Sequence, residues 1–184
     1  MKKTLIIALC CFAVVLASCH KNVLPVEPDS ADYTTKYIGN YVGQFLFSDV
    51  KMVSNGQTQT GFSFPIDNIG MDITKGTDDN AIIATVTVDN ETRQTKGIAT
   101  DDKADFEIVH LIIDKPDQGY KFELDLKMEG TKAVSDTLLN ITGTFTGNGN
   151  AVIPTQQGIQ NVVFDEVSGD LTGELVKQST SENL

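Results

Sequence analysis

The feature that most constrains the fold of this chain is a hydrophobic period of two between residues 37 and 177. A period of two places alternate side chains on opposite faces of a β-strand. No stretch of helix length shows a period of 3.6 residues, so the sequence predicts an all-β domain. The clearest strand is residues 121–129, where charged side chains alternate with Phe122, Leu124, Leu126 and Met128.

Other segments repeat this pattern. Residues 37–47 place Tyr41 and Phe45 on one apolar face, and residues 141–149 alternate Thr and Asn with a face that contains Phe145. The β-branched run 81–88 predicts a strand that is buried on both faces. Eight to ten short strands joined by hairpin turns are expected in all. The remaining strand segments are 51–53, 61–66, 71–74, 106–113, 162–164 and 169–176, with a turn at 114–119.

The pattern Gly-x-large-x-Gly occurs three times, at residues 39–43, 143–147 and 169–173. Glycines that share a strand face with a large residue indicate coiling, a bulge or the close approach of a neighbour. Closing a sheet on itself requires such bends and removes exposed edges. We therefore predict an antiparallel meander that closes into a barrel, with a β-sandwich as the alternative.

The first 18 residues have the order of a secretory signal peptide. Lys2 and Lys3 precede an apolar run at 5–16 that is shorter than the roughly 20 residues of a membrane-spanning helix. The next motif, Leu-Ala-Ser-Cys ending at Cys19, resembles the lipobox of bacterial lipoproteins. The resemblance implies that Cys19 becomes the N-terminus and carries acyl chains. An ordinary signal peptide with a cysteine near its cleavage site is the alternative.

The cysteine content and the net charge argue against disulfide bonds and against a nucleic-acid partner. Cys10 and Cys11 leave with the signal peptide and Cys19 is lipidated, so no thiol remains for a disulfide. Loss of residues 1–18 changes the formal net charge from -11 to -13. A body this acidic repels phosphate backbones, so we expect no nucleic-acid partner.

We expect a flexible tether at 19–35, a single domain at 36–178 and a disordered tail at 179–184. Residues 29–31, Asp-Ser-Ala, resemble the Asp-Ser/Thr-aliphatic sites of Bacteroidetes O-glycosylation, which predicts sugar on Ser30. The expected location is the outer membrane. The residues after Cys19 lack the run of acids associated with surface export, so the periplasmic and the surface face both stay open.

The opening residues 37–43, the closing glycine-patterned strands and the lipobox together resemble the calycin or lipocalin-like lipoproteins of Bacteroidetes. The resemblance implies a β-barrel that holds a small apolar molecule or a lipid. Lipocalins open with Gly-x-Trp, whereas this chain has Tyr41 at that place and no Trp at all.

The sequence offers little for catalysis. The body contains one histidine, His110, no cysteine and no Gly-x-Ser-x-Gly, phosphate-loop or dinucleotide motif. Acidic pairs fall in predicted turns without calcium-loop spacing. We therefore expect no enzyme, no metal site and no cofactor.

The leading hypothesis is a monomeric, lipid-anchored protein that binds an apolar molecule inside the barrel. The alternative is a rigid module with a filled core that docks another envelope protein. The predicted ligand-binding residues are Tyr41, Phe45, Phe122, Leu124 and Phe145, with His110 as a polar group.

Overall fold

The computed structural model describes residues 31–89, 91–133, 137–155 and 158–179. They belong almost entirely to one compact unit, Asp32–Leu184. The predicted signal peptide, Cys19, Ser30 and most of the predicted tail lie outside the described residues. No helix among those that the structure describes is long and apolar enough to cross a membrane.

The unit is all-β, as predicted, with two short 3₁₀-helices, η1 (Thr34–Lys36) and η2 (Pro116–Gln118). Gly119 ends η2 in the left-handed conformation, which closes the predicted turn. The strands are β1 (Gly39–Ser54), β2 (Gln57–Lys75), β3 (Ala81–Val88), β4 (Glu91–Ala99), β5 (Ala104–Phe106), β6 (Val109–Lys115), β7 (Tyr120–Lys132), β8 (Leu138–Thr155) and β9 (Gly158–Lys177).

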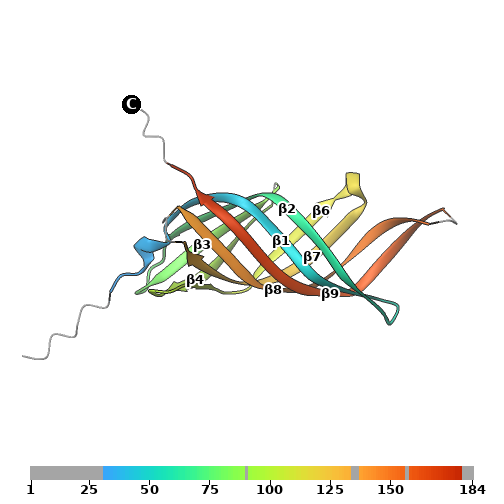
Figure 1. The fold of residues 1–184 in the computed structure, drawn as a ribbon, viewed down its shortest axis with the longest axis horizontal. Helices are drawn as coiled ribbons and strands as arrows, with labels where there is room; N and C mark the ends of the chain where they lie inside the picture. The colour runs from blue at the N-terminus through green and yellow to red at the C-terminus, as the bar shows by residue number, and fades with distance from the viewer. Residues whose placement is uncertain (1–30, 90, 134–136, 156–157, 180–184) are drawn as a thin grey trace, which may run out of the picture. The chain divides into compact units, whose positions relative to one another are not determined.

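The strands form one antiparallel sheet in the order β5-β4-β3-β2-β1-β9-β8-β7-β6. A further pairing joins β5 to β7 through Ala104 with Gly130 and Asp105 with Glu129. The hydrogen-bonded pairings therefore complete a ring that runs from β5 through β1 and β9 to β7. Figure 1 shows β1, β2, β8 and β9 as long, strongly coiled strands.

The inward faces of the strands form one apolar core. The large apolar side chains on the predicted faces of 37–47, 121–129 and 141–149 are buried and belong to one hydrophobic cluster. At about 25 cal/mol per Å² of apolar surface, this burial is the main stabilising contribution. The largest fully buried side chains are Tyr37, Tyr41, Phe45, Phe47, Phe145, Ile69, Met71, Ile73, Ile82, Leu111, Ile113 and Leu124.

Two inward glycines of β8 let the coiled strands approach closely. A Cβ atom added at Gly143 would lie 2.0 Å from the carbonyl oxygen of Lys127 on β7, and one at Gly147 would lie 2.0 Å from that of Glu123. Backbone oxygens cannot yield as a flexible side chain can. The repeated glycine pattern thus marks positions where a side chain does not fit.

The structure corrects three expectations. Residues 81–88 bury only one face, since alternate residues of β3 are buried and the residues between them are half-buried. The strands are longer than predicted. Two predicted strands, at 37–47 and 51–53, are parts of one bulged strand, β1, which begins at Gly39. Residues 32–35, placed in the tether by the sequence, belong to the unit: Thr34 is buried and Tyr33 donates its backbone N–H to Asn80.

Candidate ligand-binding site

Two hairpins extend beyond the ring at one end of the unit. The β1–β9 pairing ends at Val53 with Glu166, and β2 pairs with β3 only from Gly70 onward. The β1–β2 and β8–β9 hairpins therefore continue without neighbours on one side, and they diverge in Figure 1, at the end opposite η1. We call this the open end, and we call the end that holds η1 the closed end.

An apolar cavity of about 520 Å³ lies at the open end. Its volume falls within the range of small-molecule sites, roughly 300–1,000 Å³. The β1–β2 hairpin forms one wall, η2 and β7 form another, and the β8–β9 hairpin forms the third. The lining residues are Met52, Gln59, Phe62, Ser63, Phe64, Pro65, Gln118, Tyr120, Phe122, Ala151, Ile153 and Phe164.

A continuous row of aromatic rings organises this cavity. The Phe64 ring stacks on Phe47 with a centroid separation of 5.0 Å and an interplanar angle of 5°. The Phe122 ring lies 6.3 Å from Phe64, 6.2 Å from Phe164 and 5.6 Å from Tyr120. Contacts of this kind add about 0.5–1.5 kcal/mol each beyond area burial, so the aromatic wall is a preformed surface.

The lining of the cavity carries no formal charge. Residues 52–66 and 152–164, at the tips of the two hairpins, contain no Asp, Glu, Lys, Arg or His. None of the twelve lining residues is a carboxylate, a base or a thiol. The cavity can therefore bind by apolar contact and by amide or hydroxyl hydrogen bonds, and it offers no acid–base pair.

The structure brings only one predicted site residue to this cavity. Phe122 lines it, whereas Phe45, Leu124 and Phe145 lie deeper in the ring, where they are buried. The Phe145 ring packs edge-to-face on Phe47 at 4.9 Å. All three residues belong to the buried apolar core of the ring.

Tyr41 lies towards the closed end. Its hydroxyl donates to the backbone oxygen of Tyr37 at 2.8 Å, and Lys132 Nζ lies 4.8 Å from the centre of its ring. Burial raises the pKa of the nearby Tyr37 hydroxyl, and the carboxylates of Asp101 and Asp102 raise it further. Among the described residues that hydroxyl has no hydrogen-bond partner.

The predicted inward position of His110 is wrong. His110 lies on the outer face of β6, where its Nδ1 is 2.9 Å from Asp125 Oδ1 on β7. Both faces of residues 106–113 carry apolar side chains, and Val109, Leu111 and Ile113 take the inner one. His110 therefore cannot act as a polar group in the ring interior.

Sequence reasoning missed most of the aromatic wall. Phe62 and Phe64 stand on β2, Tyr120 follows η2, and Phe164 lies on β9. The alternation of Phe62, Phe64 and Ile66 was the available signal on β2. Nothing in the sequence indicates that these segments, of which Phe64 and Phe164 are 100 residues apart, meet at one end.

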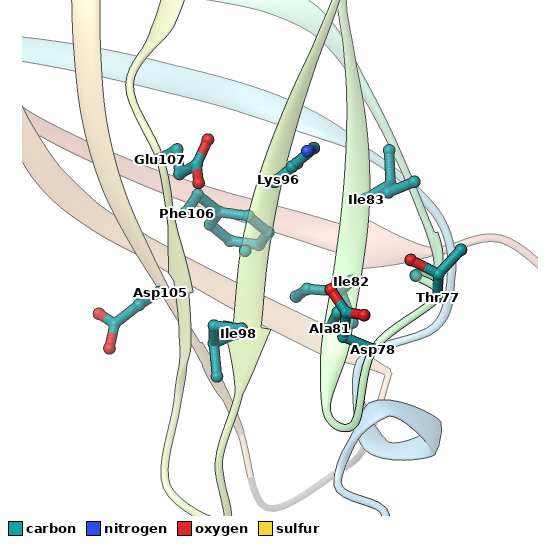
Figure 2. Close-up of a pocket in the computed structure, with 12 residues that line it drawn as sticks. Thr77, Asp78, Ala81, Ile82, Ile83, Lys96, Ile98, Asp105, Phe106 and Glu107 are labelled. Atoms are coloured by element: carbon teal, nitrogen blue, oxygen red, sulfur yellow. The ribbon is translucent and has the colours of Figure 1, made fainter.

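A second pocket, of about 450 Å³, lies mainly on the outward face of β3, β4 and β5. Figure 2 shows the apolar side chains of Ile83 and Ile98 there with Lys96, Asp105 and Glu107 around them. Lys96 and Glu107 are exposed to solvent, so their charges interact only weakly with other groups. No group of three or more His, Cys, Asp or Glu side chains within the described part of the chain could hold a metal ion.

Comparison with known proteins adds little. No family model matches the chain, and no curated protein matches it. A solved structure of a multidomain protein including DUF1735 from Bacteroides ovatus is similar, with a TM-score of 0.25 and 14% sequence identity. The match covers 80% of this chain and 61% of that one, so this chain spans less than two thirds of its length. A TM-score this low supports no conclusion about fold or function.

Proposed function

We propose that this chain is a lipid-anchored protein of the bacterial outer membrane whose ring of strands is a calycin-like barrel. Its function is to bind a small apolar molecule, without catalysis, in the cavity at the open end. The anchor is Cys19, as its lipobox-like context implies. Three features support the barrel: the antiparallel meander, the β5–β7 pairing that completes the ring and the inward glycines that allow sharp coiling.

The uncharged cavity with its aromatic wall is the observation that carries the proposal. Apolar lining with a few polar groups such as Gln59, Ser63 and Gln118 is the usual composition of a small-molecule site. A free fatty acid would bring a carboxylate with no cation in the lining to pair with it. An uncharged apolar molecule therefore fits better.

The site differs from the one expected from the sequence. The interior of a small barrel is often filled by its own side chains, and Phe45, Leu124 and Phe145 are buried inside this ring of strands. Binding in the ring interior would require these side chains to leave well-packed positions. The open end needs no such rearrangement.

The test is binding of an uncharged fluorescent apolar probe to the chain without residues 1–18 and with Cys19→Ala. Phe62→Asp places a charge in the cavity lining at a side chain that is already 44% exposed. Burying an unpaired carboxylate is costly, so we expect the probe's Kd to rise at least about tenfold. Val42→Asp is the matched control, because Val42 is also 44% exposed and lies outside the cavity lining.

Equal affinity of the two variants would overturn the cavity as the site. Native mass spectrometry of the purified protein provides an independent measurement, since a carried ligand adds a mass that disappears on denaturation.

The anchor has its own test. Full-length Cys19→Ala should leave the membrane fraction, because several acyl chains at about 0.8 kcal/mol per CH₂ would be lost. Unchanged membrane association would contradict the lipobox assignment. Glycopeptide analysis of protein from its native source tests the sugar proposed for Ser30.

A further inference from the structure

The beginning of β9 has an edge that no other strand occupies. β8 pairs with β9 along its whole length, starting at Thr155 with Gly158. On the other side, β1 reaches only as far as Glu166. Within the described residues no strand pairing uses the second edge of residues 159–165. Figure 1 shows the β1–β2 hairpin diverging from this edge.

The sequence of this edge favours pairing. Residues 159–164, Ile-Gln-Asn-Val-Val-Phe, contain no charge, no Pro and no Gly, and four of the six are β-branched or aromatic. Proteins usually guard exposed edges with Lys, Pro or a bulge. Here the residues pair regularly with β8, and Ile159 and Val163 are 80% and 59% exposed on the outward face. Such a segment on an open edge attracts another strand.

The occupant of this edge must offer backbone hydrogen bonds. A strand edge carries unpaired N–H and C=O groups, and lipid tails cannot satisfy them. Another extended polypeptide can. The chain carries a formal net charge of -11, so two copies repel one another over most of their surfaces. The uncharged hairpin is the part of each copy that another can approach at the least electrostatic cost.

We propose that a second copy of this chain pairs with this edge, so that β9 of each copy joins antiparallel across a two-fold axis. A two-fold axis perpendicular to the sheet keeps outward side chains on the same face in both copies. In the register centred on Asn161, Ile159 of one copy lies opposite Val163 of the other. Asn161 then lies opposite its own symmetry mate. The two exposed apolar side chains of the edge thus cover each other.

The pairing is short, so the dimer is weak. About five residues of each copy take part, and a small interface is typical of transient association. Added salt screens the repulsion between the acidic bodies and strengthens the dimer. The proposal departs from the monomer expected from the sequence, and it is independent of what the cavity binds.

Analytical ultracentrifugation of the chain without residues 1–18 and with Cys19→Ala tests the proposal over a wide concentration range. We expect reversible dimerisation that Val163→Lys weakens at least about tenfold, because each lysine faces an apolar partner and blocks the edge. Val176→Lys is the matched control. Val176 is 50% exposed on the same strand, but it is already paired with Val42 and Leu138. Ile159→Lys is a second edge variant.

A cross-link tests the register. This form of the chain contains no cysteine, since all three lie within residues 1–19. Asn161→Cys should form an intermolecular disulfide readily, because opposite residues of an antiparallel pair lie within disulfide reach. Glu174→Cys, exposed on the doubly paired part of β9, should not. A monomer at every concentration, equal effects of Val163→Lys and Val176→Lys, or equal cross-linking of the two cysteine variants would each overturn the proposal.

Discussion

The two ends of the folded unit differ in the kinds of side chains that form them. At the closed end, residues near η1 make charged and polar contacts: Lys75 Nζ lies 2.5 Å from Asp32, and Lys177 Nζ donates to the backbone oxygen of Ile38 at 2.7 Å. At the open end, the hairpins carry no charge, and aromatic rings line a cavity.

This difference indicates that one part of the unit stabilises the fold and the other part binds. At the closed end, Lys75 and Lys177 donate hydrogen bonds within the chain, whereas at the open end the second edge of β9 is unpaired among the described residues and the side chains of Ile159 and Val163 are exposed. Exposed apolar surface and free edges are liabilities that a protein retains when they contact something else. Function is therefore expected at the open end.

The largest expected effect comes from shortening one aromatic side chain to alanine in each of the two regions. Phe45→Ala removes a fully buried ring and leaves a cavity in the ring of strands, so the free energy of unfolding should fall by about 3–5 kcal/mol. Phe62→Ala at the open end should cost less than about 1 kcal/mol, because Phe62 is already 44% exposed in the folded chain. Urea unfolding monitored by circular dichroism measures both. A similar loss in both variants would show that the projecting hairpin is part of the stabilising core.

A second test concerns how tightly the ring is coiled where the hairpins leave it. Gly147→Ala places a methyl group 2.0 Å from a backbone oxygen of β7, so one strand must shift, at about 1–3 kcal/mol. Gly70→Ala is the control, since its Cβ would lie 3.5 Å from Thr87, an ordinary contact. Its unfolding free energy should change by no more than about 0.5 kcal/mol. If the two alanine variants were equally stable, close strand approach would not explain the glycine.

The sequence predicted the strands because alternation is a local property. Tyr41, Phe45, Phe122 and Phe145 all face inward as their period of two indicates. The same pattern did not predict which face of its strand His110 occupies. Period two shows which residues share a face, and it cannot choose the inner face when both are apolar.

The candidate site was less predictable, since its lining comes from five strands and η2. Of the site residues predicted from the sequence, Phe122 is the one that lies at the cavity. The meeting of Phe64, Phe122 and Phe164 depends on the coiling of the ring and on where each pairing stops. Those are properties of the whole sheet, and single segments do not encode them.

The smallest predicted effect concerns the closed end. The Asp32 carboxylate accepts hydrogen bonds from Lys75 Nζ and from the hydroxyl and backbone N–H of Thr34, at 2.5, 2.6 and 3.0 Å. These bonds, with that of Lys75 the strongest, lower the pKa of Asp32 from 3.8 to about 2. A lowered pKa in the folded state stabilises the fold above the unfolded value, and that contribution is lost as the pH falls from about 4 to about 2.

Asp32→Asn should therefore be less stable than the unmodified chain at neutral pH, and the gap should close by about pH 2. Because the pair is exposed, added salt should narrow the gap as well. Unfolding curves measured between pH 2 and pH 7 report both effects. Probe binding at the open end should not change, since Asp32 makes no contact with the cavity lining. A gap that persists at pH 2 would show that the asparagine acts through packing and not through the lost charge.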